Sequence, residues 1–414
     1  MNIVANVVFH LSLPIVMLKK HLPNINAVLL GIILFQILIY HKFLALSIVL
    51  WMVLSIVNLI INKPKLHWNN IRFLFVVLYL LYVIGVLYST NKSNATFDLE
   101  VKMSLVIFPV FIGFTAYNVQ RLKLLLYVFI SGAILSIMIL FGNAMLNYME
   151  TGSVGFFFYN RLSPWVHPSY FSFYLNVIML LLIYDFITGK LSLFKRHFHL
   201  IIFAFFTLFI ALTTAKIALV TSFVLIIVIL IHWVRQSKWV PVLIFVFGGL
   251  GLFGTVYTQS DFAKERINEF FNAFESKGTK RYLYSTGLRK VIWQNSWELY
   301  MEKPILGYGT GDVTDNLMLK YAESNNLNAL DKRLNAHNQF LQTGIAIGIF
   351  GLLCLVLLML VPLIYYRQNH LFAGITLLTI FFLLTESAFE TQAGVIGILL
   401  LYSLFSVNPL NEKV

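Results

Sequence analysis

The sequence predicts an all-α polytopic membrane protein with about twelve transmembrane helices and a large helical loop before the tenth. Hydrophobic residues make up 59% of its 414 residues, charged residues only 11%, and the mean hydropathy is +0.82. Soluble domains carry about 25% charged residues. Apolar runs of about 20 residues, the length that crosses a hydrocarbon core as a helix, recur along almost the whole chain.

The net charge of +13 indicates membrane topology rather than binding of nucleic acid. The polar segment 259–336 holds 11 basic and 10 acidic residues, and the other 19 basic and 7 acidic residues lie in short loops, termini and span ends. Short basic loops of membrane proteins face the cytoplasm, so we assign the basic side, with the C-terminus, to the cytoplasm. The loops with a basic excess are 62–72, 119–123, 188–197, 235–238 and Arg367.

Twelve apolar segments have a length suited to crossing a membrane. They lie near 25–41, 43–61, 71–88, 103–118, 122–146, 168–187, 198–213, 216–234, 239–257, 337–366, 371–385 and 390–407. Residues 1–18 either span the membrane or lie in its interface. No basic region precedes them and no small-residue cleavage site follows, so we expect no cleaved signal peptide.

These segments divide the chain into three parts. They are N-terminal transmembrane helices over 1–258, a periplasmic loop domain over 259–336, and C-terminal transmembrane helices over 337–414. The loop contains two predicted helices, Asp261–Phe274 and Gly287–Lys303. The second should end at Pro304, because proline cannot continue a helix.

The stretch from His337 to Leu352 is where we expect the chemistry. It opens with a histidine and polar residues and continues as an apolar helix. A helix unbroken to Tyr366 would be roughly 45 Å long, against a hydrocarbon core of about 30 Å, which places His337 at the depth of lipid headgroups. One face below His337 carries small residues that would let a neighbouring helix or a lipid tail pack closely. That face consists of Leu341, Gly344, Gly348 and Gly351.

The predicted helix Gly287–Lys303 carries a cation and aromatic residues on one face. Arg289, Trp293, Trp297 and Tyr300 follow one another at helical spacing. Two interpretations remain open from this pattern. The helix is an interfacial amphipathic helix with an aromatic belt, or Arg289 binds a phosphate while the aromatic residues line a sugar or lipid path.

Two short segments near these helices carry features that favour anion binding. Residues 304–312, PILGYGTGD, form a glycine-rich turn that either exposes backbone N–H groups to an anion or simply caps the preceding helix. The turn lacks the GK[ST] of a nucleotide-binding loop. Lys216 follows a very short turn between two apolar spans, so its ammonium group either snorkels to the interface or faces a polar cavity.

Other outward-facing polar residues are weaker candidates. Arg161 and His167 lie in the loop 147–167, where a histidine before a proline is more often a loop residue than a catalyst. Glu386 and Glu390 lie four residues apart in a predicted outer turn, where capping or solvation is the ordinary role. No His/Asp/Glu cluster has the spacing of metal ligands, and the single cysteine, Cys354, excludes a disulfide within one chain.

These motifs together resemble the O-antigen ligase and O-antigen polymerase superfamily of bacterial surface polysaccharide assembly. The resemblance covers most of the chain: the number of spans, the large outer loop and three local signatures. The signatures are His337-Asn338 with Leu341, Gly348 and Gly351-Leu352; Arg289 with the tryptophans and PILGYGTG after it; and LTTAK over 212–216. The third departs from the family pattern, which has a serine–arginine pair where this chain has Ala215-Lys216.

The resemblance implies an inverting, metal-independent membrane glycosyltransferase without a cofactor, in the bacterial inner membrane with its active site facing the periplasm. The donor would be a glycan on undecaprenyl diphosphate, and the acceptor a sugar hydroxyl of the lipid A–core. His337 and Arg289 would be catalytic. Donor diphosphate and glycan would be bound by Lys216, Arg161, Asn338 and Trp293.

Two alternatives to a ligase remain. A polymerase of the same superfamily would extend the lipid-linked glycan instead, and one sequence does not reveal the acceptor pocket. A transporter for a lipid-linked glycan would also need basic residues, but transporters often show inverted repeats and charged or broken helices at mid-membrane. The sequence indicates neither feature.

Overall fold

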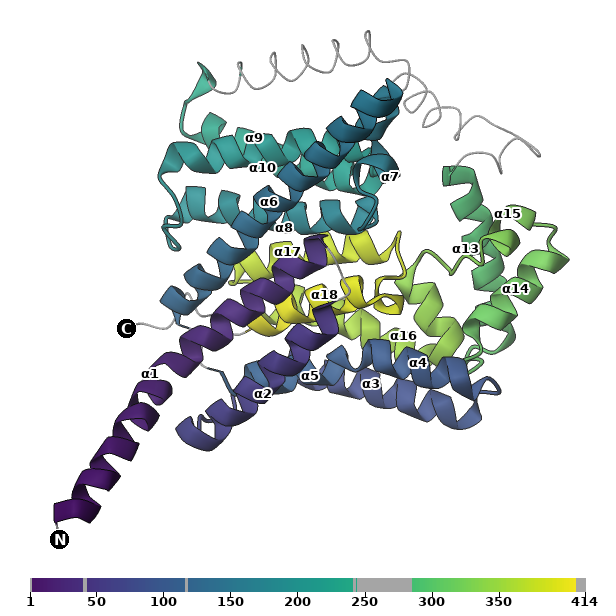
Figure 1. Ribbon diagram of the computed structural model, residues 1–414. Helices are drawn as coiled ribbons and strands as arrows, with labels where there is room; N and C mark the ends of the chain where they lie inside the picture. The colour runs from purple at the N-terminus through teal and green to yellow at the C-terminus, as the bar shows by residue number, and fades with distance from the viewer. Residues whose placement is uncertain (1, 40–42, 116–117, 241–242, 244–284, 407–414) are drawn as a thin grey trace.

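The computed structural model describes residues 2–39, 43–115, 118–240, 243 and 285–406. These residues form helices and loops and no strand, which confirms the predicted all-α class (Figure 1). Eight described helices are long and apolar enough to cross a membrane, so the chain is a multi-pass membrane protein. They are α1 (Asn2–Ile39), α2 (Leu44–Asn62), α3 (Asn70–Tyr88), α6 (Val119–Thr151), α8 (Pro168–Thr188), α9 (Arg196–Thr213), α10 (Lys216–Arg235) and α16 (Gln339–Tyr365).

Three further apolar helices are shorter than the spans we expected. In place of the span 103–118 the chain forms α5 (Ser104–Gly113), which directly follows the polar helix α4 (Lys92–Lys102). Helices α17 (His370–Leu383) and α18 (Gln392–Phe405) have 14 residues each. At 1.5 Å per residue they are about 21 Å long, less than the hydrocarbon core of about 30 Å. The expected span 239–257 and the expected helix 261–274 lie, almost entirely, outside the described residues.

The loop before α16 contains more helices than the sequence indicated. Helix α13 (Ser285–Glu302) agrees with the predicted Gly287–Lys303 and ends before Pro304. Two short helices, α14 (Val313–Glu323) and α15 (Leu327–Asp331), follow the glycine-rich turn. In Figure 1 these three helices lie together at one end of the bundle, away from the C-terminus. This end holds the candidate site.

The opposite end of the bundle gathers the basic loops. The backbone N–H of His67 donates to the carbonyl of Gly113 at 2.8 Å, and the Asn369 amide donates to the carbonyl of Phe405 at 2.9 Å. The side chain of Asn69 reaches Ser406 at 3.1 Å. The predicted cytoplasmic loop 62–72, the end of α5 and the segment after Arg367 therefore lie beside the C-terminal end of α18.

The centre of the bundle is built around α18 and α8. Residues Ala393–Phe405 of α18 are all buried, and so is most of α8. A helix enclosed on all sides is apolar all round, which explains why neither helix shows a polar face. Helix α17 packs between them and delivers the turn that follows it to the outer end, where η4 (Ala388–Glu390) leads into α18.

The expectation of an unbroken helix from His337 to Tyr366 is wrong. Helix α16 is interrupted at Ile347, with φ −133° and ψ 22°, and at Gly348, with φ +63° and ψ −156°. The second conformation is open to glycine and strained for other residues. The break lies beside Gly85, in the last turn of α3. The calculated overshoot of a straight helix therefore does not apply to His337.

Candidate active site

The carboxylate of Glu386 lies at the centre of the outer polar site. Arg289 on α13 places Nη2 2.7 Å from Oε1, and His337, next to the start of α16, places Nδ1 3.4 Å from Oε2. Glu386 follows α17 and is 4% exposed. The two residues that the resemblance implies are catalytic are thus joined through a third, which the sequence analysis left as an ordinary turn residue.

Glu386 is held as a carboxylate although it is buried. Burial by itself would raise its pKa. The hydrogen bond from His337 and the nearby charge of Arg289 outweigh burial and hold the pKa of Glu386 below its usual range. A negative charge at this position can in turn fix the orientation of Arg289.

The backbone around His337 is unusual for a residue other than glycine. His337 has φ +45°, in the left-handed region, and its N–H donates to the side chain of Asn335 at 3.0 Å. Its carbonyl accepts from Nε1 of Trp293 at 3.1 Å. Such strain persists where surrounding contacts impose it, and it is common at active sites. With Nδ1 on Glu386, the imidazole has Nε2 available for another partner.

Asn338 supports the site from within the fold. Its Oδ1 accepts from the N–H of Leu341 and caps α16, while its Nδ2 donates to the carbonyl of Leu384 at 3.1 Å. Its own N–H donates to the hydroxyl of Ser387 at 3.2 Å. We predicted that Asn338 binds substrate. In the structure, its side-chain oxygen and nitrogen hold the start of α16, and with it His337, close to the turn that contains Glu386.

Helix α13 positions Arg289 and Trp293 by burying a different face. Ile292, Ser296 and Leu299 are buried, which orients the helix against its neighbours. Trp293 is partly buried beside His337, whereas Trp297 is 52% exposed. The Arg289 side chain is 27% exposed, so it reaches both Glu386 and solvent.

His167 belongs to the same site. The pKa of His167 is lowered, first because the surrounding protein displaces water and further because the Arg289 charge is near, while Glu386 raises it. Its Nδ1 accepts from the N–H of Ser169 at 3.3 Å and caps α8. Its ring packs against the rings of Tyr159 and Tyr170. Sequence reasoning favoured a loop residue, because the electrostatic influence of Glu386 on His167 arises only from the packing of α8 on α17.

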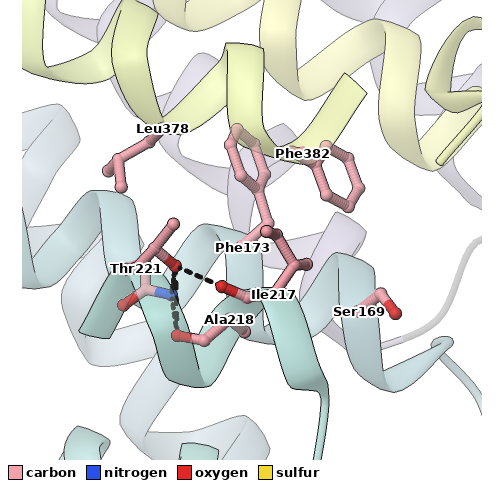
Figure 2. Close-up of a pocket in the computed structure, with 8 residues that line it drawn as sticks. Ser169, Phe173, Ile217, Ala218, Thr221, Leu378 and Phe382 are labelled. Atoms are coloured by element: carbon pink, nitrogen blue, oxygen red, sulfur yellow. Dashed lines mark hydrogen bonds between the residues drawn. The ribbon is translucent and has the colours of Figure 1, made fainter. Parts of the chain in front are cut away.

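Lys216 begins α10 on the same side of the bundle. The turn before it is tied to α8 by a hydrogen bond of 2.8 Å between the hydroxyls of Thr213 and Ser172. Below it, a cavity of about 10 Å³, room for about one water, lies between α8, α10 and α17. Figure 2 shows how Ser169 and Ile217 line this cavity together with Phe382, one turn before Glu386.

Arg161 lies away from Glu386 in its described contacts. Its guanidinium stacks over the ring of Phe156, with 5.4 Å from Cζ to the centroid, and the side chain is exposed. The residue belongs to the short helix α7 (Tyr159–Leu162) of the outer loop. The structure brings it to the outer face of the bundle, and no described ion pair joins it to Glu386.

Most N–H groups of the glycine-rich turn are bonded within the protein. The N–H groups of residues 307–312 all donate to oxygen atoms of the protein, among them the carbonyls of Ile345 and Ala346 on α16. The anion-binding interpretation is therefore wrong for residues 307–312. The turn and α13 occupy the small-residue face of α16, where we expected a neighbouring helix or a lipid tail. A side chain at Gly348 would meet Ile305 of the turn, and one at Gly344 would meet Tyr300 of α13.

A second polar cluster anchors the other end of the turn that holds Glu386. Lys102 is fully buried, with Nζ 2.7 Å from Oε2 of Glu390 and 3.5 Å from Oδ2 of Asp98, and lies 5.0 Å from the centroid of the Tyr82 ring. Gln339 joins the cluster to α16, since its Oε1 accepts from the N–H of Phe389 at 2.7 Å. Sequence reasoning missed this cluster, and its one local signal was the four-residue spacing of Asp98 and Lys102.

The described residues contain no group of three or more His, Cys, Asp or Glu side chains that could hold a metal ion. The polar groups gathered around Glu386 are instead a carboxylate, a guanidinium and two imidazoles. Such a set can move a proton and offset negative charge.

Comparison with known proteins identifies the segment that carries most of this site. Residues 200–356 match the family described as O-antigen ligase. The match includes Lys216, Arg289 and His337 and ends before Glu386. An uncharacterized protein of Haemophilus influenzae is 30% identical over 86 residues, which are 20% of this chain and 21% of that protein. The family match confirms the resemblance drawn from the sequence motifs.

Proposed function

Because the chain belongs to the O-antigen ligase and O-antigen polymerase superfamily, we propose that it transfers a glycan from undecaprenyl diphosphate to a sugar hydroxyl of the lipid A–core. The family supports a ligase or polymerase type of activity, and the choice of the ligase, with its donor and acceptor, is our proposal. The observation that carries the site assignment is the joint binding of Arg289 and His337 to Glu386.

The reaction needs a base for the acceptor and a positive charge for the leaving group. The acceptor hydroxyl oxygen attacks the anomeric carbon of the donor sugar, and its proton passes to Nε2 of His337. The bond between that carbon and the diphosphate oxygen breaks, and the diphosphate leaves with the electron pair. Attack from the face opposite the leaving group inverts the anomeric configuration.

Arg289 has the geometry to stabilise the departing diphosphate. Only Nη2 contacts Glu386, and the side chain is partly exposed, so its other N–H groups can bind phosphate oxygens. One charge-assisted hydrogen bond contributes about 1.5–3 kcal/mol, which is roughly ten- to more than a hundredfold in rate. Glu386 holds Arg289 and keeps the imidazole of His337 in one orientation.

The other predicted binding residues take secondary roles in this proposal. Lys216 would add positive charge from the start of α10 without the two-pronged geometry of an arginine. Trp293 and Asn338 would act by holding His337, and Arg161 would meet the glycan farther out. We propose that this side of the bundle faces the periplasm from the inner membrane, where the donor arrives already activated. Charge stabilisation by side chains then needs no metal or nucleotide.

Transport of a lipid-linked glycan is less well supported. The break in α16 is a feature that the sequence analysis did not expect and that transporters often share. Here the break lies beside Gly85, within one turn of the outer end of α3, and it is filled by backbone from the loop. Because backbone of the loop occupies the break, the break offers no path through the bundle. It instead helps to hold the start of α16 at the site.

The test uses the purified full chain, a glycan on undecaprenyl diphosphate and a lipid A–core acceptor, with a chelator present. We expect transfer by the wild type and its loss in Arg289→Ala and His337→Ala, with donor binding retained in His337→Ala. Near-normal transfer by either variant at normal protein level would overturn the site assignment, and a requirement for added metal would overturn the metal-independent mechanism.

A deletion strain separates ligase from polymerase. Long polymer left on the carrier lipid and missing from the core means a ligase, which we expect. A core that bears a single repeat means a polymerase, and it would replace the acceptor in our proposal.

A further inference from the structure

At the break in α16, backbone groups of the helix form hydrogen bonds with the glycine-rich turn instead of with each other. In a continuous helix the N–H of Ile349 would donate to the carbonyl of Ile345. Here it donates to the carbonyl of Pro304 at 2.8 Å, and the carbonyl of Ile345 accepts instead from the N–H of Tyr308, also at 2.8 Å. The carbonyl of Ala346 accepts from the N–H of Gly309 at 2.9 Å. We call these three bonds, between residues 304–309 and 345–349, the clasp.

The clasp needs glycine on both sides of the contact. A Cβ at Gly348 would lie 2.1 Å from the carbonyl oxygen of Ile305, and one at Gly307 would lie 2.6 Å from that of Ile345. Both glycines have positive φ, +63° and +74°. Backbone atoms cannot move aside as the end of a side chain can, so any larger residue would push the turn out of the break.

The turn is also fastened to α3. The hydroxyl of Thr310 donates to the carbonyl of Tyr82 at 2.6 Å, and the hydroxyl of Tyr88 donates to the carbonyl of Leu306 at 2.5 Å. Gly85 leaves room for Thr310, since a Cβ there would lie 2.4 Å from its hydroxyl oxygen. The clasp is thus a fixed point in the bundle.

From the clasp, α13 and the first turns of α16 run side by side to the active site. Tyr300 packs on Gly344, and Trp293 binds the carbonyl of His337. Beyond these contacts, Arg289 and His337 meet at Glu386. The eight residues from Gln339 to Ala346 form only about two helical turns, so a change of angle at the break moves His337 directly.

We infer that the clasp is a positioning device, in which Gly307 and Gly348 set the distance between Arg289 and His337. Its effect on transfer rests on the proposed function, while the clasp itself can be measured without activity. Catalysis needs reacting groups placed within a fraction of an ångström, and misplacement lowers turnover more than binding.

The test compares Gly348→Ala and Gly307→Ala with Gly152→Ala. Gly152 ends α6 with φ +68°, and a Cβ there meets nothing within 4 Å, so this control carries the same backbone strain without the clash. Hydrogen exchange reports the amides of Tyr308, Gly309 and Ile349. We expect exchange at least tenfold faster in the two clasp variants, transfer at least tenfold slower, and donor affinity within a few fold of the wild type. The control, Gly152→Ala, should match the wild type in hydrogen exchange, transfer rate and donor affinity.

Gly344→Ala serves if the other variants do not accumulate. Its Cβ would meet the ring of Tyr300 at 3.0 Å, a side chain that can give way, so exchange and turnover should change in the same direction but less. Unchanged exchange in Gly348→Ala, or in Gly344→Ala if only that variant accumulates, would overturn the clasp. Faster exchange with normal turnover would overturn its positioning role. Failure of the Arg289 and His337 variants to lose transfer would instead count against the proposed function.

Discussion

Arg289 and Glu386 form an ion pair across 97 positions of the chain, with 2.7 Å between Nη2 and Oε1. Glu386 is almost completely buried, and Arg289 is partly open to the outside. A buried carboxylate that holds a guanidinium at the edge of a site can fix where that cation meets a substrate. The pair therefore makes Glu386 as necessary to the proposed mechanism as the residues that touch the substrate.

Glu386→Gln should reduce transfer by ten- to a hundredfold. The amide keeps the shape of the side chain but loses the charge that holds Arg289 and the carboxylate oxygen that contacts His337. Glu386→Asp should retain part of the activity. Glu150→Gln, at an exposed position on the outer end of α6, is the matched control and should be normal. Transfer assays on membranes with equal protein levels measure all three, and full activity of Glu386→Gln would remove Glu386 from the site.

Arg289→Lys should restore transfer only in part relative to Arg289→Ala. A lysine ammonium can pair with Glu386 or with a phosphate, but it lacks the fork that would serve both at once. Lys290→Ala, at the exposed neighbouring position, should transfer normally. Turnover and donor affinity of the four proteins test this, and equal turnover of the lysine and arginine forms would count against a two-sided role for Arg289.

The spans could be predicted from composition alone, because long apolar runs have few other stable structures. Arg289 and His337 could be predicted from their resemblance to a family pattern. Glu386 could not, since its role comes from the packing of α17 and α13 against the start of α16. A carboxylate in a short turn looks the same in sequence whether it is solvated or buried beside an arginine.

The break in α16 also depends on partners distant in the chain. An apolar run with three glycines has the same hydropathy whether it is straight or interrupted. The interruption is stabilised by N–H groups of Tyr308 and Gly309, and no local signal in 339–365 reveals them. The same limit applies to Lys102, whose partner Glu390 lies 288 positions away.

Lys216→Arg should keep much of the transfer activity, and Lys216→Ala should lose at least tenfold. The site near the start of α10 requires positive charge in our proposal, and arginine supplies it with more donors. Lys190→Ala, in an exposed loop at the other end of the bundle, is the control. If the arginine and alanine variants both showed full activity, Lys216 would return to the role of a snorkelling residue.

Lys102 and Glu390 should show strong coupling in a double-mutant cycle. Their side chains are 1% and 13% exposed, and removing one charge leaves the other buried without its partner, at a cost of about 3–5 kcal/mol. Replacing both, as in Lys102→Met with Glu390→Gln, should recover much of that stability. Thermal unfolding in detergent measures the cycle, with Lys190→Met as the control. Additive effects of the two substitutions would contradict a buried pair.

Asp98 should make the protein less stable as the pH rises from about 4 to above 6. Burial, with some help from Glu390, raises the pKa of Asp98 to about 6, although Lys102 lowers it. An unfolded aspartate has a pKa near 3.9, so the folded state favours the protonated form. The stability that protonated Asp98 contributes is fully present below the unfolded pKa of about 3.9. It is lost as the pH rises through the folded pKa of about 6.

Asp98→Asn mimics the protonated form and should remove this dependence. The stability of the variant relative to the wild type should therefore increase between pH 4.5 and 7.5, by no more than about 3 kcal/mol. Asp331→Asn, at an exposed position of α15, should leave the pH dependence as it is in the wild type. Melting temperatures across this pH range compare the three proteins. Parallel curves for Asp98→Asn and the wild type would show that Asp98 is ionised throughout, with Lys102 shared between two carboxylates.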